Sequence, residues 1–135
     1  MPQVNVSLVH VLVAAIAAMI IGSLWYSKIL FGKEWQALVG LKDSDMKAGA
    51  SKAMVTAAVA ALITAYVLAH IVVYANAKTW MDGAVTGFWI WLGFVATMLV
   101  SGAAFEDRPM KLTLINAGNQ LVALVVMGAI LAGWV

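Results

Sequence analysis

Residues 53–77 read AMVTAAVAALITAYVLAHIVVYANA, a run of 25 residues without Asp, Glu, Lys or Arg. A helix of about 20 apolar residues crosses the ~30 Å hydrocarbon core of a bilayer. Three more uncharged stretches of similar length occur elsewhere in the chain. The sequence therefore predicts an all-α integral membrane bundle, a single transmembrane domain over residues 1–135, with helices at about 6–27, 46–77, 83–105 and 112–135.

The composition excludes a water-soluble helical bundle. Hydrophobic residues make up 64% of the chain and charged residues 10%, so its helices lack the polar face that water demands. Cysteine is absent, which excludes disulfides, thiolate nucleophiles and thiolate metal ligands. A signal peptide begins with a positively charged region, and no basic side chain precedes Ser7. We therefore expect the first helix to be retained.

Lysine and arginine are concentrated in two of the three predicted loops. Seven of the eight basic side chains lie in the first loop or the third, and Lys78 is alone in the second. Cytoplasmic loops carry the positive excess, so we expect loops one and three in the cytoplasm and both termini outside it, in a bacterial inner membrane. The net charge of +2 then reflects topology, and the expected partner is the lipid bilayer and not a nucleic acid.

The first loop contains a short helical pattern. Residues 29–39, ILFGKEWQALV, mix apolar and charged side chains at helical spacing. They predict an amphipathic helix in the membrane interface that stops at Gly40. Asp43 or Ser44 is then expected to cap the second long helix, and Asp107 the fourth.

Small residues recur every four positions in the predicted helices, which lets helix backbones approach closely in lipid. The rows predict helix packing within the bundle or, alternatively, in a homo-oligomer. Trp89 and Trp91 lie on nearly opposite sides of the third helix, so we expect one to meet lipid or another subunit and the other to pack inward. The packing candidates are Ala14, Ala18, Gly22, Ala57, Ala61, Ala65, Gly83 and Gly87.

Three amide side chains share one face of the fourth helix. Asn116, Asn119 and Gln120 are spaced i, i+3 and i+4. Amides that face lipid leave donors and acceptors unpaired at a cost of several kcal/mol, so we expect this face to turn inward or to line a wet cavity. An interhelical hydrogen-bond network and a ligand or ion site are the two interpretations.

Glu106 ends the third helix, where its carboxylate faces the negative end of the helix dipole. A salt bridge to a nearby basic residue is the first expectation. The alternative is a polar mouth toward the cytoplasm in which Glu106 joins Tyr26, Ser27 and Asn116.

His10 and His70 carry the hypothesis of a metal or haem site. Both lie a few residues inside the outer ends of their predicted helices, and neutral imidazoles on two helices are suitable ligands. Two histidines without a carboxylate make a poor zinc site. Packing beside Tyr66 or Tyr74 is therefore favoured, and no cofactor is predicted.

Two segments of the chain, and a pair of residues between them, also resemble a known family. The run GSLWYSKILFGKEW at 22–35, followed by Phe105 and Glu106 and by LINAG at 114–118, is similar to the bacterial family called domain of unknown function 1761. The resemblance covers essentially the whole chain in length, layout and order of motifs. It implies a small four-helix membrane protein and brings no activity, substrate or catalytic residue.

Three kinds of function stay open at this point. A non-catalytic scaffold or subunit that binds another membrane protein requires nothing that the sequence lacks, and it is the first expectation. An oligomeric transporter or channel for a small solute or ion would line its path with Asn116 and Gln120, although no acidic residue lies at mid-membrane. A membrane enzyme with Glu106 and Tyr26 as acid and base, or a haem or metal bundle, is the second alternative.

Overall fold

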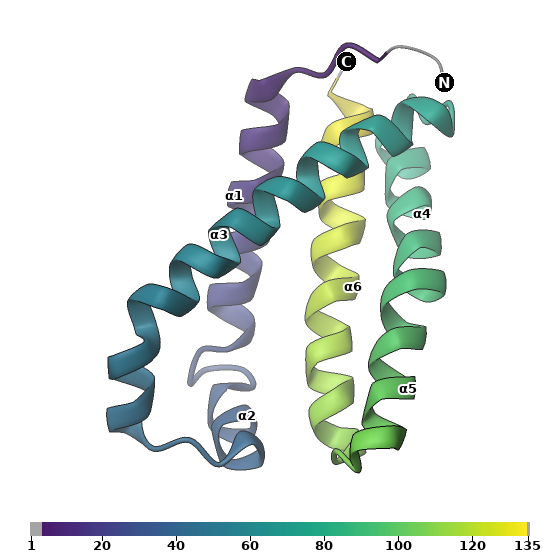
Figure 1. Cartoon of the computed structure of the whole chain (residues 1–135). Helices are drawn as coiled ribbons and strands as arrows, with labels where there is room; N and C mark the ends of the chain where they lie inside the picture. The colour runs from purple at the N-terminus through teal and green to yellow at the C-terminus, as the bar shows by residue number, and fades with distance from the viewer. Residues whose placement is uncertain (1–3, 135) are drawn as a thin grey trace.

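Long helices account for most of the computed structural model, which describes residues 4–134 (Figure 1). No strand occurs in that part of the chain. Four helical stretches are long and apolar enough to cross a membrane, as predicted. They are α1 at Leu8–Trp25, α3 at Asp43–Tyr74, the composite stretch Trp80–Glu106, and α6 at Met110–Gly133. Val135, the predicted end of the last helix, lies outside the described residues.

Side-chain caps fix where two of the helices begin. The Ser7 hydroxyl accepts a hydrogen bond from the His10 N–H at 3.4 Å at the start of α1. The Thr79 hydroxyl accepts from the Asp82 N–H at 3.1 Å, so α4 (Trp80–Ile90) begins three residues before the predicted residue 83. Asp82 is well placed in this first turn, because a carboxylate there complements the positive end of the helix dipole.

The third long stretch is not a uniform α-helix. Between α4 and α5 (Thr97–Glu106) lies η1, a π-helical segment at Trp91–Ala96. Such segments insert an extra residue into the helical turn and are frequent at functional sites. The sequence WLGFVA is uniformly apolar, so nothing in its pattern predicted this interruption.

The first loop contains the predicted short helix. It is α2, at Gly32–Val39, and Gly40 ends it in the left-handed conformation with φ of 74°. The prediction that Asp43 or Ser44 caps the next helix is wrong. Lys42 precedes α3, and its N–H donates to the Asp45 carboxylate at 3.0 Å.

Asp107, in the third loop, ends one helix and does not cap the next. Asp107 follows α5 in the left-handed conformation, with φ of 55°, and thus ends that helix. Pro109 is the residue that precedes α6. The expectation that Asp107 caps the fourth helix is therefore wrong, because the left-handed turn after α5 occupies this residue first.

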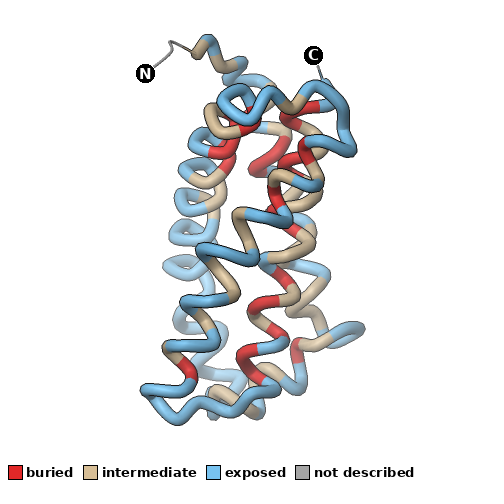
Figure 2. Tube along the Cα trace, turned by 90° about the vertical axis from the view of Figure 1, so that its right-hand side faces the viewer, coloured by how far each residue is buried: buried red, intermediate tan, exposed pale blue. Residues whose placement is uncertain are grey.

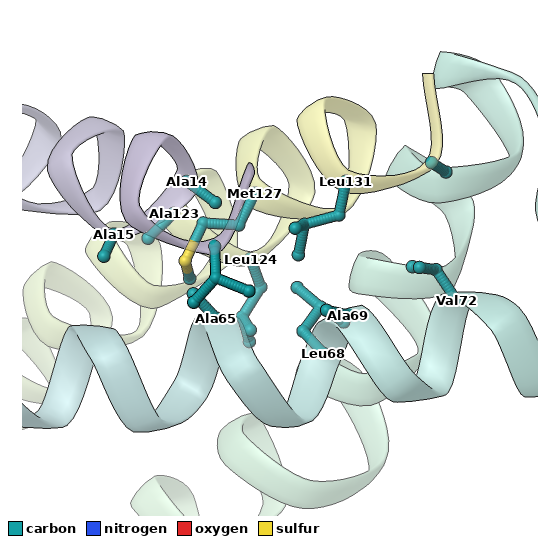
Figure 3. Close-up of a cluster of buried hydrophobic side chains, with 12 residues drawn as sticks. Ala14, Ala15, Ala65, Leu68, Ala69, Val72, Ala123, Leu124, Met127 and Leu131 are labelled. Atoms are coloured by element: carbon teal, nitrogen blue, oxygen red, sulfur yellow. The ribbon is translucent and has the colours of Figure 1, made fainter. Parts of the chain in front are cut away.

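The buried core lies where α1, α3 and α6 meet. Ala14 of α1 and Ala65 of α3 are fully buried, and Leu68 is 2% exposed. Figure 3 shows Leu68 and Ala69 of α3 facing Met127 and Leu131 of α6. In Figure 2 the buried positions gather on the inner sides of the helices, and the outer sides are exposed. Small residues on α1 and α3 bring the three backbones together, as the predicted rows require.

α4 and α6 pack even more closely. Gly83 and Gly87 are both buried. A Cβ atom on Gly83 would overlap the Gly128 carbonyl, and one on Gly87 would overlap the Leu124 carbonyl. The two backbones are thus in direct contact along this seam.

The first half of α3 is largely exposed, although the Gln36 amide of α2 donates a hydrogen bond to the Asp43 carboxylate at its first residue at 2.8 Å. Residues 43–57 are exposed throughout, and Figure 1 shows α3 crossing the bundle obliquely, so that this half diverges from α6. We call residues 43–60 the α3 arm. Ala57 lies in it and is exposed, so the prediction that Ala57 packs within the bundle is wrong for a single chain. Ala61 is half-buried at the point where the arm reaches the other helices.

Candidate functional site

The end of α1 and the beginning of α6 are joined by side-chain hydrogen bonds. The Trp25 indole N–H donates to the Ile115 carbonyl at 2.8 Å. The Tyr26 hydroxyl donates to the Asn116 Oδ1 atom at 2.7 Å. Both bonds connect residues 90 positions apart in the sequence. The two segments that carry the family resemblance are therefore direct neighbours in the fold.

Gly118 supplies the space for this junction. A Cβ atom at that position would lie 2.7 Å from the Trp25 ring, closer than a carbon contact allows. The indole therefore approaches the α6 backbone closely at a position two residues beyond Asn116. We call Trp25, Tyr26, Asn116 and Gly118 the motif cluster.

A second tryptophan reaches the same turn of α6 from the other side. The Trp91 indole N–H donates to the Ala117 carbonyl at 2.8 Å, whereas Trp89 is 61% exposed. Trp91 is the first residue of η1. The inward tryptophan is therefore Trp91, and its hydrogen bond lies beside the π-helical interruption.

α2 is held against the motif cluster by its aromatic residues and by one ion pair. The Phe31 ring lies 4.9 Å from the Trp25 ring, and the Trp35 ring lies 5.6 Å from that of Tyr26. The Lys111 ammonium lies 3.2 Å from the Glu34 carboxylate and links α2 to the start of α6. This ion pair was not predictable from the sequence, because Glu34 and Lys111 lie in different loops.

The turn between α1 and α2 needs glycine at its end. Gly32 is buried, and a Cβ atom there would overlap the Tyr26 carbonyl. The Gly32 N–H donates to the Ser27 carbonyl at 2.8 Å. This close backbone approach explains the glycine that follows Phe31 in the first of the two resembling segments.

The three amides of α6 do not share one environment. Asn116 is half-buried and bonded to Tyr26, Asn119 is buried, and Gln120 is exposed. The Asn119 Oδ1 atom has no hydrogen-bond partner within residues 4–134. Gly22 faces it from α1, since a Cβ atom on Gly22 would lie 4.0 Å from that oxygen. We expected the amide face either to turn inward or to line a wet cavity, and within a single chain Gln120 does not turn inward.

Glu106 and Ser27 take no part in the motif cluster. Glu106 forms a salt bridge with Arg108, and both side chains are about half exposed. The Ser27 hydroxyl donates to the Leu24 carbonyl of its own helix at 2.6 Å. Of the proposed polar mouth, the structure brings together only Tyr26 and Asn116.

Each histidine has an aromatic neighbour of its own. The His10 ring stacks on Trp134 at 4.2 Å. His70 Nδ1 lies 2.8 Å from the Tyr66 carbonyl, and the two rings are 4.7 Å apart. No group of three or more His, Asp or Glu side chains that suits a metal occurs among residues 4–134. These contacts are those of packing histidines.

The grooves on the surface of the helices are lined largely by apolar side chains. One lies between α3, α4 and α6, and apart from Thr64 its lining is apolar, with Ile63, Leu68, Ile90 and Leu124 among the lining residues. The motif cluster's polar groups are bonded to one another or to α6 carbonyls. These bonds connect the end of α1 to the beginning of α6.

A family model described as a protein of unknown function, DUF1761, matches residues 9–132. The chain belongs to this family. The match spans both segments of the motif cluster, so the DUF1761 resemblance seen in the sequence is confirmed. No curated protein and no solved structure matches the chain.

Proposed function

We propose that this DUF1761 protein is a non-catalytic scaffold of the bacterial inner membrane that binds another membrane protein. The observation that carries the proposal is the α3 arm, which is exposed along residues 43–57. An arm of this kind presents small side chains to a neighbouring helix without competition from its own bundle. The motif cluster acts as a brace, because it fixes α1 and α2 against α6 independently of α3.

The orientation proposed with this function places loops one and three in the cytoplasm. The start of α1 and the end of α6 lie at one end of the fold, and α2 lies at the other end with the loop between α5 and α6 (Figure 1). Seven of the eight basic side chains belong to the α2 end. This distribution supports a cytoplasmic α2 and outer termini.

A photo-crosslinking experiment tests the scaffold. A photoreactive amino acid replaces Ala57 in the α3 arm or, as the control, Met98 on α5, which is 73% exposed. In native membranes we expect one discrete adduct between position 57 and a protein of different mass from this chain, and lipid adducts from position 98. Lipid adducts from both positions would contradict the proposal.

An oligomeric pathway for a small solute or ion is the second candidate. The exposed carboxamide of Gln120, one turn from Asn116, is the observation that favours it. Flux into proteoliposomes that disappears in the Gln120→Leu variant would support this function. Equal flux in the variant would remove Gln120 from any pathway.

A further inference from the structure

Gln120 lies in the sector of α6 that α3 covers elsewhere. Asn116 is bonded by Tyr26 from α1, and Ala117 by Trp91 from η1. Gln120 follows Asn116 by four residues and Ala117 by three. It therefore lies on the helix face between these two contacts. One more turn along that face, Leu124 is 4% exposed and lines the same groove as Leu68 of α3.

The uncovered face lies at mid-span. Gln120 is ten residues from the start of α6, at about 15 Å along a helix that rises 1.5 Å per residue. Side-chain hydrogen bonds from α6 within residues 4–134 involve Asn116 and Thr113, and Gln120 is exposed without one. An unpaired amide at this depth costs several kcal/mol in hydrocarbon. Thr97, by contrast, is also exposed but donates to the Gly93 carbonyl of its own stretch at 2.9 Å.

We propose that a second copy of this chain covers Gln120 in a two-fold symmetric dimer. A closed two-fold interface places each residue near the axis opposite its own copy. A carboxamide satisfies that condition, because it carries both donors and an acceptor, so two Gln120 side chains hydrogen-bond each other. A charged side chain at the same place would repel its copy.

The rest of the uncovered face suits this partner. α3 and α6 both run from the α2 end of the fold toward its opposite end, and their lower halves diverge (Figure 1). Ala60, at the end of the arm nearest the bundle, is exposed and small, which permits close approach of a helix from the second copy. Residues 53–77 carry no Asp, Glu, Lys or Arg, so like charges do not meet across the axis.

The dimer rests on the proposed membrane insertion, but it does not depend on a different partner protein. The chain has no cysteine, so any disulfide between two copies must form at the one cysteine that is introduced. The Gln120→Cys variant is reconstituted into phosphatidylcholine vesicles and oxidised, and we expect a disulfide-linked dimer. The matched control is Val122→Cys, which lies two residues away and about 200° around the helix; we expect it to stay monomeric.

A second measurement gives the strength of the contact. Fluorescence energy transfer between labelled copies is followed as lipid dilutes the protein in vesicles. We expect Gln120→Leu to weaken dimerisation about tenfold, the range of interhelical amide hydrogen bonds in lipid, and Gln120→Asn to retain much of it. Equal association of Gln120→Leu and the unaltered chain, cross-links only at position 122, or a monomer at every dilution would overturn the proposal.

Failure of the dimer is distinguishable from failure of the scaffold. The vesicles contain only this chain, so a monomer there leaves the heterologous adduct at position 57 in native membranes untouched. Conversely, a dimer in vesicles with lipid adducts alone at position 57 would retain the Gln120 contact and remove the scaffold.

Discussion

The seam between α4 and α6 and the α3 arm are opposite solutions to packing in one small protein. In the seam, Gly83 and Gly128 bring two backbones into contact. In the arm, residues 43–57 are exposed on every side, although they include alanines at the same four-residue spacing. Small residues therefore permit close packing but do not determine that it occurs within one chain.

The largest expected effect is on the seam. Gly83→Ala places a Cβ atom into the Gly128 backbone, and a rigid backbone cannot yield as a side chain does. We expect a loss of about 3 kcal/mol in the free energy of unfolding, at the upper end of overpacking costs. Unfolding in mixed detergent and sodium dodecyl sulfate, followed by tryptophan fluorescence, measures it.

Gly93→Ala is the matched control for this change. A Cβ atom there meets no other atom within 4 Å, and we expect stability to change by less than about 0.5 kcal/mol. Equal losses in both variants would mean that the α4 to α6 seam does not depend on backbone contact.

An intermediate effect is expected inside α3 itself. Ala65 is 0% exposed, so Ala65→Leu must displace neighbours at the junction of α1 and α6 and should cost about 2 kcal/mol. Ala57→Leu, two turns earlier on the exposed arm, should cost less than about 0.5 kcal/mol. The same unfolding assay compares the two variants on monomeric protein, diluted in an excess of detergent. A large loss from Ala57→Leu in the monomer would show that the chain covers its own arm.

The four long helices could be predicted because lipid imposes a simple condition on their length and charge. Residues 53–77 meet it without exception, and Gly40 ended α2 as its conformational freedom predicts. The end of α3 that leaves the bundle was not predictable, because Ala57 and Ala65 belong to one row with one pattern. Which of them is buried depends on the angle at which α3 crosses α6.

In the candidate site, too, some features were predictable from the sequence and others were not. Asn116 was singled out from the spacing of three amides, and the structure gives it the Tyr26 hydroxyl as a partner. The placement of Gln120 was not predictable, because exposure depends on the distance between α3 and α6. The role of Trp91 required the π-helical turn in η1, for which an apolar sequence carries no local signal.

The smallest of the three effects concerns the brace between α1 and α6. Tyr26→Phe removes the hydroxyl that donates to Asn116 at 2.7 Å and leaves that amide oxygen without its partner. We expect a loss of about 1–2 kcal/mol in the free energy of unfolding, the cost of leaving a partly buried acceptor without its hydrogen bond. Tyr66→Phe, at a tyrosine that is 48% exposed, is the control and should change stability by less than about 0.5 kcal/mol.

If the two variants unfold alike, the Tyr26 hydroxyl is dispensable, and α1 is held on α6 by the Trp25 indole and by the buried alanines instead. A selective loss in Tyr26→Phe would place the motif cluster with the rigid seam, and it would leave the α3 arm as the part of the molecule free to meet a partner.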